Sequence, residues 1–234
     1  MEKIKIAISP EDRSSNIYHK KALWNGKQTN EHEQMCRFAD ALETHLVRCG
    51  FEVYNMQFGN MYDRVAYADS MGVSLYIAPH TNGFDGNAKG CRIHHYPSSK
   101  SERFAQLLVD GVKPLYYADS PAPKTVSDNT LYELRKPAAP AVLPEWAFHD
   151  NEYDAKWIIS AIPALAEMTA KMVCKYFNVE YVPCETAPMY RVPCETAPMY
   201  RVQIGAFRNR EYAEELLRIV RVDFPDAFIK ESED

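Results

Sequence analysis

Three polar residues stand at points in the sequence where short apolar segments or predicted helices begin or end. His80 follows the apolar segment 73–79, Glu145 ends another apolar segment, and Glu31 lies in the first turn of a helix predicted over 30–50. Histidine and carboxylate groups are the usual ligands of catalytic zinc, which takes about three protein ligands and leaves a position for water. A nearby carboxylate can then act as general base. The three residues therefore indicate a hydrolytic metal site.

Each of these residues also has a purely structural explanation. Glu31 can be a first-turn acid stabilised by the helix dipole, and His80, before a Thr-Asn-Gly loop, can be a turn residue. Glu145 is harder to explain in this way, because a carboxylate directly after a buried strand is desolvated unless it has a partner. Thr81 and Asn82 lie beside His80, where they can hydrogen-bond a peptide substrate.

The composition argues against two classes of partner. The 234 residues are 46% hydrophobic and 25% charged, which is typical of a globular protein. A net charge of -5 provides no electrostatic footprint for nucleic acid or for an anionic membrane. The longest apolar stretch, 157–168, is shorter than the ~20 residues of a membrane span. We therefore expect no nucleic-acid partner and no membrane partner.

Two further features bear on the cellular compartment. The first residues run directly into a strand pattern without an apolar signal segment, so we expect synthesis in the cytoplasm without a signal peptide. The six cysteines are scattered and form no C-x-x-C pair. Scattered cysteines of this kind predict reduced thiols.

Strand and helix patterns alternate over residues 1–179. Strand patterns occupy 3–9, 51–56, 73–79, 90–97 and 140–145, and helix patterns occupy 30–50, 61–71, 101–112 and 152–177. This alternation predicts an α/β fold with a mostly parallel twisted sheet flanked by helices on both faces. Pro163 should kink or break the last of these helices.

A duplicated decapeptide separates this region from the C-terminal tail. The sequence VPCETAPMYR occupies 182–191 and again 192–201, and its prolines favour an extended linker over a strand or helix. The predicted organisation is a catalytic domain over 1–179, a Pro-rich linker over 180–199 and a small β-α-β unit over 200–234.

The order of motifs over 1–178 resembles the zinc-dependent N-acetylmuramoyl-L-alanine amidases, which include bacterial wall hydrolases and phage endolysins. The resemblance rests on Glu31 opening the first long helix and on the segments IAPHTNG, GCRIHHY and APAVLPEWAF. It implies that Glu31 and His80 bind Zn²⁺ and that Glu145 is the general base. The implied reaction is cleavage of the amide between N-acetylmuramic acid and L-alanine in peptidoglycan.

One segment departs from the pattern of this family. The family usually takes its first zinc ligand from a glycine-flanked histidine after the opening strand, but here the segment reads SPEDRSSN and Asp12 stands at that place. Either Asp12 coordinates zinc or His149 supplies the ligand. We favour His149, because it leaves the strand that presents Glu145 and because similar sequences with an SP opening carry FHDN there. The structural alternative for His149 is a helix cap within the HDN segment.

His94 and His95 are neighbours in a predicted strand. Adjacent strand residues point to opposite faces of a sheet, so at most one of these two histidines faces the site.

The tail over 200–234 resembles the first half of a SPOR domain, a peptidoglycan-binding module. Only one β-α-β unit of the usual two is present, which implies that half a module suffices or that two chains pair theirs in a homodimer. The resemblance makes peptidoglycan the partner, and it suggests an endolysin released by a holin or an enzyme freed by lysis.

Two other functions stay open at this point. If the missing histidine means that the metal is lost, the chain is a non-catalytic wall-binding protein on an amidase scaffold. Alternatively, two carboxylates can serve a muramidase-type glycosidase.

Overall fold

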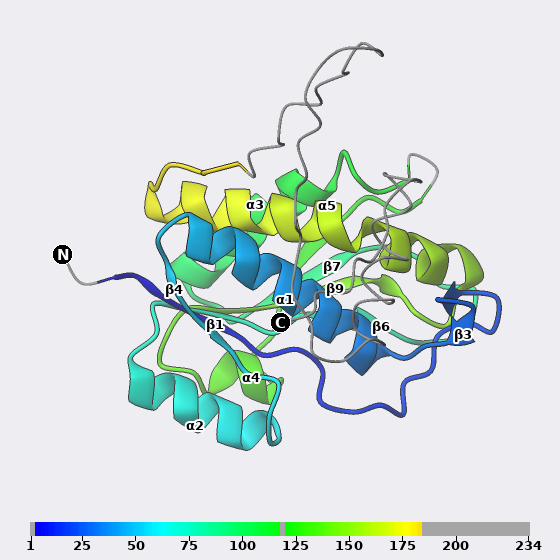
Figure 1. Ribbon diagram of the computed structural model, residues 1–234, viewed down its shortest axis with the longest axis horizontal. Coiled ribbons are helices and arrows are strands. Elements are labelled where there is room, and N and C mark those ends of the chain that lie inside the picture. The colour runs from blue at the N-terminus through cyan, green and yellow to red at the C-terminus, as the bar shows by residue number, and fades with distance from the viewer. Residues whose placement is uncertain (1–2, 118–119, 184–234) are drawn as a thin grey trace, which may run out of the picture. The chain divides into compact units, whose positions relative to one another are not determined.

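The central element of the structure is a seven-stranded sheet with helices on both faces (Figure 1). The computed structural model describes residues 3–117 and 120–183. The strands are β1 (Lys5–Ile8), β2 (Leu23–Trp24), β3 (Lys27–Gln28), β4 (Glu52–Asn55), β5 (Leu75–Ile77), β6 (His80–Asn82), β7 (Arg92–His95), β8 (Lys124–Ser127) and β9 (Ala141–Phe148). The helices are α1 (Glu31–Arg48), α2 (Met61–Met71), α3 (Ser99–Val112), α4 (Tyr132–Arg135) and α5 (Glu152–Phe177). The chain divides into two units, Met1–Cys184 and Glu185–Asp234, and the description concerns the first.

The sheet is mostly parallel, as the alternation of strands and helices predicts. Its strand order is β4-β1-β5-β9-β7-β8, and β6 continues the line of β5 alongside β9. The pairs of β1 with β4, β1 with β5, β5 with β9, and β6 with β9 are all parallel. The exception is β7, which pairs antiparallel with β9. On its other side β7 pairs with β8, and that pair is parallel. The predicted α/β fold class is therefore confirmed.

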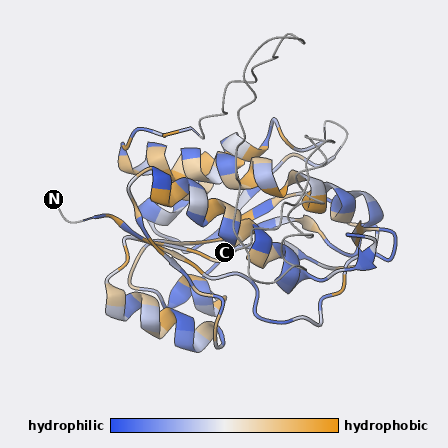
Figure 2. Cartoon of the chain, viewed as in Figure 1, coloured by the Kyte–Doolittle hydropathy of each residue, from blue (hydrophilic) through white to orange (hydrophobic). Residues whose placement is uncertain are grey.

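Two apolar layers cover the sheet, one on each face. The alternation along β1 shows how they arise, because Ile6 and Ile8 belong to the larger layer while Ala7 between them belongs to the smaller one. The larger layer packs against α1, α3 and α5, and the smaller one packs against α2 and α4. The helices carry both hydrophobic and hydrophilic residues, as amphipathic helices do (Figure 2).

The last helix, α5, runs without a break through Pro163. Its N-cap is Asn151, whose side chain accepts hydrogen bonds from the backbone N–H groups of Tyr153 and Asp154. The cap within the HDN segment is therefore Asn151, and His149 does not supply it. By length and composition α5 could cross a membrane, but 61% of its most apolar window is buried inside the protein, against α1 and α3. It packs as a core helix.

The sequence patterns did not predict the shortest elements. The hairpin β2–β3, the strands β6 and β8 and the four-residue helix α4 span two to four residues each and lie outside the longer apolar patterns that predicted the other strands. Residues 184–234, which hold most of the duplicated decapeptide and the predicted β-α-β unit, lie outside the described residues.

Candidate metal centre

The carboxyl ends of the parallel strands bring residues from distant parts of the chain to one edge of the sheet. Glu11 follows β1, His80 begins β6, and Glu145 lies within β9 directly opposite His80 in the strand register. Glu31 is the first residue of α1, which begins at the capping residue Asn30. The placement of Glu31, His80 and Glu145 at one rim is therefore a consequence of the parallel pairing.

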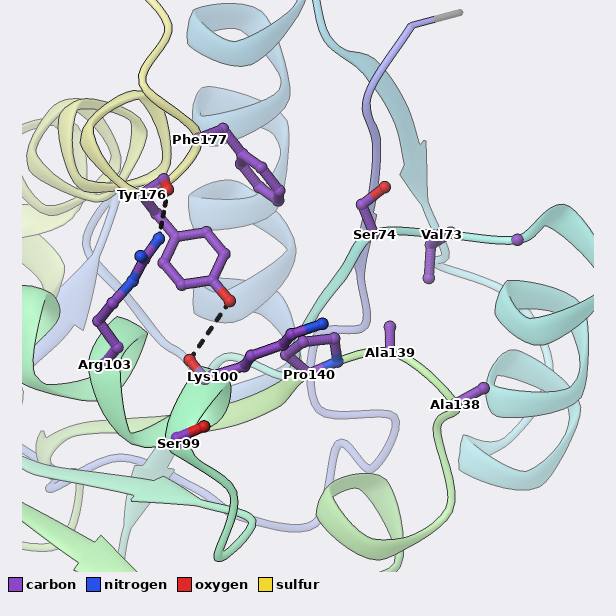
Figure 3. A pocket seen from close by; sticks show the side chains of 11 residues that line it. Val73, Ser74, Ser99, Lys100, Arg103, Ala138, Ala139, Pro140, Tyr176 and Phe177 are labelled. Carbon is purple, nitrogen blue, oxygen red and sulfur yellow. Dashed lines mark hydrogen bonds between the residues drawn. The ribbon is translucent and has the colours of Figure 1, made fainter.

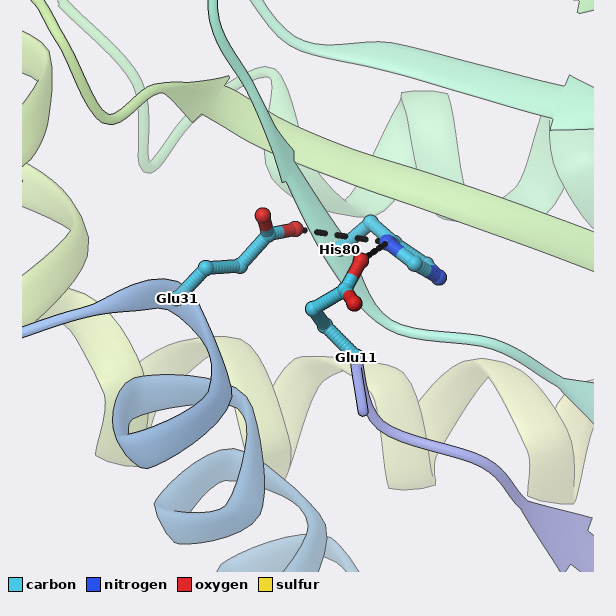
Figure 4. A group of neighbouring side chains, drawn as sticks. All are labelled: Glu11, Glu31 and His80. Carbon is cyan, nitrogen blue, oxygen red and sulfur yellow. Dashed lines mark ion pairs between the residues drawn. The ribbon is translucent and has the colours of Figure 1, made fainter. Parts of the chain in front are cut away.

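Glu11, Glu31 and His80 form a compact group of possible metal ligands (Figure 4). Nδ1 of His80 lies 3.1 Å from Oε2 of Glu11 and 3.3 Å from Oε1 of Glu31. The two carboxylates are only 4% and 1% exposed. Two buried carboxylates beside one imidazole nitrogen need a compensating cation, either a proton on the imidazole or a bound metal.

The geometry of this group fits zinc. Ligand atoms about 2.0–2.1 Å from a tetrahedral zinc are separated from one another by roughly 3.3 Å, which agrees with the distances from Nδ1 of His80 to both carboxylates. The carboxylates are also held in place. Oε1 of Glu31 accepts the backbone N–H of Thr81 at 2.6 Å, Oε2 accepts the amide of Asn16 at 2.7 Å, and Glu11 accepts the backbone N–H of Arg13 at 2.7 Å.

The pKa values of Glu11 and His80 shift in opposite directions, because each group favours the charged form of the other. Burial alone would raise the pKa of Glu11, but hydrogen bonding and charge from His80, together with Arg13, lower it to about 2. Burial alone would lower the pKa of His80, but Glu11, Glu133 and Glu31 raise it well above its usual value. The carboxylates around His80 therefore favour positive charge at this point, which a divalent cation would also supply.

Glu145 lies beside this group with partners of its own. Its Oε2 accepts a hydrogen bond from the side-chain amide of Asn82, and Nε2 of His94 lies 3.7 Å from the same oxygen. On the other side of the ring, Nδ1 of His94 lies 3.4 Å from Oδ2 of Asp128. Burial alone would lower the pKa of His94. Hydrogen bonding and charge from Glu145 and Asp128 outweigh that effect, so the pKa of His94 is raised.

The adjacent histidines of β7 point to opposite faces, as their positions require. His94 faces Glu145, whereas His95 is buried and its Nδ1 contacts the backbone oxygen of Tyr96 at 2.9 Å. His94 is therefore the histidine that lines the site.

His149 lies next to the group but outside it. Its Nδ1 is 3.0 Å from the hydroxyl of Thr81 and 3.9 Å from Oε2 of Glu31, and its ring stacks on Tyr18. Gly83 leaves room for this ring, since a Cβ at that position would lie 2.9 Å from Nε2 of His149. The assignment of His149 as a zinc ligand stays a prediction.

The sequence pattern offered Asp12 or His149 as the third ligand, with His149 favoured, and did not indicate Glu11. Oδ2 of Asp12 accepts the first backbone N–H of α2, from Met61, at 3.2 Å, so Asp12 is bound to the start of a helix and lies outside the metal group. Glu11 and Asp12 are adjacent acids after the first strand, and this pair could have indicated that one of them turns toward the sheet edge.

Thr81 and Asn82, the predicted substrate-binding residues, are engaged with the site itself. The backbone and hydroxyl of Thr81 contact Glu31 and His149, and the amide of Asn82 donates to Glu145. Their role toward substrate stays a prediction.

The opposite edge of the sheet differs in character. A hollow of about 720 Å³ lies where β5 and β9 begin, lined by residues such as Ala139, Pro140 and Phe177 (Figure 3). Arg103 donates to the backbone of Tyr176 there. Within the described residues, the group with metal-ligand geometry lies at the other edge.

Comparisons with known proteins agree with this architecture. Residues 20–214 match the family model described as N-acetylmuramoyl-L-alanine amidase. Over 99 residues the chain is 33% identical to an uncharacterized cell wall amidase of Bacillus anthracis. That match covers 40% of this chain and 19% of the relative, so the chain spans about a fifth of that protein's length.

Solved structures show the same fold at low sequence identity. An N-acetylmuramoyl-L-alanine amidase from Clostridium difficile 630 superposes with a TM-score of 0.65 at 18% identity, covering 76% of this chain and 98% of that one. AmiC2 of Nostoc punctiforme gives 0.62 at 17% identity, with coverage of 76% and 98%. The catalytic domain of the CD27L endolysin gives 0.56 at 23% identity, with coverage of 74% and 97%.

Proposed function

Because the chain belongs to the N-acetylmuramoyl-L-alanine amidase family, we propose that it hydrolyses the amide between N-acetylmuramic acid and L-alanine in peptidoglycan. The observation that carries this proposal is the convergence of two buried carboxylates, Glu11 and Glu31, on one nitrogen of His80. Such an arrangement stabilises a divalent cation at the rim where a strand also presents Glu145.

The donor set of the site suits zinc. Nδ1 of His80 and one oxygen each from Glu31 and Glu11 would hold the ion, which leaves a position for water and substrate. A zinc ion bound there would lower the pKa of a water molecule and polarise the scissile carbonyl.

The remaining chemistry falls to Glu145 and its neighbours. Glu145 accepts the proton of the attacking water and returns it to the amine nitrogen of the leaving L-alanine. The amide of Asn82 donates a hydrogen bond to one carboxylate oxygen of Glu145, which orients the carboxylate. His94, placed between Glu145 and Asp128, adds positive charge beside the base when it is protonated.

Digestion of purified peptidoglycan tests this proposal. The full chain with zinc should release new amino termini of L-alanine, and a chelator should abolish that release until zinc is restored. Release of reducing sugar ends that is insensitive to the chelator would instead indicate a muramidase-type glycosidase. Binding to peptidoglycan without any release, with zinc present, would indicate a non-catalytic wall-binding protein.

The remaining parts of the hypothesis concern segments outside the described residues. Binding of peptidoglycan by the half SPOR-like tail over 200–234, and homodimer formation through it, stay predictions. The same holds for release to the wall by a holin or by lysis.

A further inference from the structure

Glu133 in α4 is a buried carboxylate to which the proposed reaction assigns no part. It is only 6% exposed, and its Oε1 accepts two hydrogen bonds, from the hydroxyl of Ser9 at 2.6 Å and from that of Tyr76 at 2.7 Å. Ser9 follows β1 and Tyr76 lies in β5, so α4 is tied to the two strands that lead to the metal centre. Burying a carboxylate costs desolvation free energy, so its second oxygen needs a partner as well.

The second oxygen of Glu133 faces His80. Oε2 lies 3.6 Å from Nε2 of His80, and that nitrogen is buried without a hydrogen-bond partner among the described residues. The other ring nitrogen, Nδ1, faces Glu11 and Glu31. The imidazole of His80 therefore has carboxylates at both of its nitrogens, two on the ligand side and one on the opposite side.

We propose that Glu133 is a positioning residue of the metal centre, which accepts the Nε2–H of His80 and thereby presents the Nδ1 lone pair to the metal. Histidines that bind metals usually donate their second ring N–H to a carboxylate, carbonyl or water, and this contact sets both tautomer and ring orientation. Ser9 and Tyr76 fix the carboxylate in turn by donating to its other oxygen. The inference rests on the proposed zinc site.

The geometry distinguishes this role from that of a metal ligand and from that of a purely structural link. Glu133 does not belong to the group of converging ligand atoms, since it faces the ring nitrogen that points away from Glu11 and Glu31. A purely structural link between α4 and the strands would need only Oε1 of Glu133, and it would not account for Oε2 lying 3.6 Å from the buried Nε2 of His80.

Zinc affinity, measured by competition with a chromophoric chelator, tests the proposal on the full chain. Glu133→Met removes the acceptor at similar volume and should weaken zinc binding roughly 10–100-fold. Glu133→Gln keeps an acceptor oxygen without the charge and should bind zinc with intermediate affinity. The matched control is Glu167→Gln, an exposed glutamate of α5 paired with Lys171, which should bind zinc like the wild type.

Long-range proton–nitrogen NMR of the zinc-loaded protein provides a second readout. With zinc on Nδ1 the ring proton of His80 lies on Nε2 in every variant, so the signal of that proton reports its hydrogen bond: in the wild type it should be shifted downfield and protected from exchange, and Glu133→Met should lose both effects. Tyr76→Phe keeps the charge of Glu133 and removes one donor, so it should weaken zinc binding by a smaller factor. It also serves as the test variant if Glu133→Met does not fold.

The outcomes distinguish this inference from the metal centre itself. If His80→Ala binds zinc as tightly as the wild type, the proposed metal centre is wrong and the role of Glu133 is wrong with it. If His80→Ala loses zinc while Glu133→Met and Tyr76→Phe keep both wild-type affinity and the wild-type His80 spectrum, only the role of Glu133 is overturned.

Discussion

His80 and His94 are both largely buried histidines flanked by carboxylates, but the carboxylates are arranged differently around the two rings. At His80, two carboxylates approach the same nitrogen, Nδ1. At His94, Asp128 lies at Nδ1 and Glu145 at Nε2, on opposite sides of the ring. The ligand atoms of Glu11, Glu31 and His80 converge on one point and can hold an ion. The carboxylates of Asp128 and Glu145 lie on opposite sides of the His94 ring, so they cannot share an ion with it and can only interact with its two nitrogens. The arrangement of partners therefore distinguishes a candidate metal ligand from a candidate partner of the base.

The sharpest test of this comparison removes each histidine in turn. His80→Ala should leave no zinc above the buffer background and reduce amide hydrolysis to background, because the group loses the nitrogen on which it converges. His94→Ala should retain about one zinc per chain. Metal analysis after dialysis measures both variants, and loss of zinc from the His94 variant alone would reverse the assignment.

The second test separates the base from the ligands. Glu145→Gln should lower kcat by roughly 10²–10⁴-fold, because the amide cannot accept the proton of the attacking water. Its zinc content should equal that of the wild type, since Glu145 lies outside the ligand group. Release of amino termini from peptidoglycan measures the rate, and near-normal activity would exclude Glu145 as the base.

The third test concerns the ligand that completes the centre. Glu11→Gln should weaken zinc binding by at least about 10-fold, since it replaces a charged ligand within the converging group. Asp12→Asn should have little effect, because Asp12 is bound to the backbone of Met61. The decisive comparison is with His149→Ala: if that variant loses zinc and Glu11→Gln keeps it, the ligand is His149, as the sequence pattern favours.

The smallest expected effect concerns the pH dependence of the rate. The pKa of His94 is raised, so the ring keeps positive charge beside Glu145 at pH values where an ordinary histidine begins to lose it. In the wild type kcat/KM should fall as the pH rises through the raised pKa of His94, because the positive charge beside Glu145 is then lost. His94→Gln removes the titrating group, so this alkaline limb should be absent from its pH profile. An unchanged pH profile would show that His94 does not influence the base.

The sequence predicted the features that follow from periodicity and from strand ends. The long helices, the parallel sheet, and the rim with Glu31, His80 and Glu145 all follow from apolar patterns of sufficient length. The position of Glu11 could not be predicted in this way, because the irregular segment after β1 decides which of two adjacent acids points inward.

The role of Glu133 could not be predicted from the sequence for a different reason. It lies on a helix of four residues, too short to show a period, and glutamate is seldom buried without partners. Its partners Ser9 and Tyr76 are separated from it by 124 and 57 residues, and only the assembled sheet brings them together.

The central position of β9 also affects how the chain acquires its site during synthesis. Among the described strands β9 comes last in the sequence, yet it lies between β5 and β7 in the interior of the sheet (Figure 1). A chain still emerging from the ribosome therefore lacks Glu145, the strand opposite His80, and the middle of its own sheet. Because these pairings are non-local, folding should be slow to complete. A fragment that ends before β9 should consequently lack both the proposed base and the strand that pairs with β5, β6 and β7.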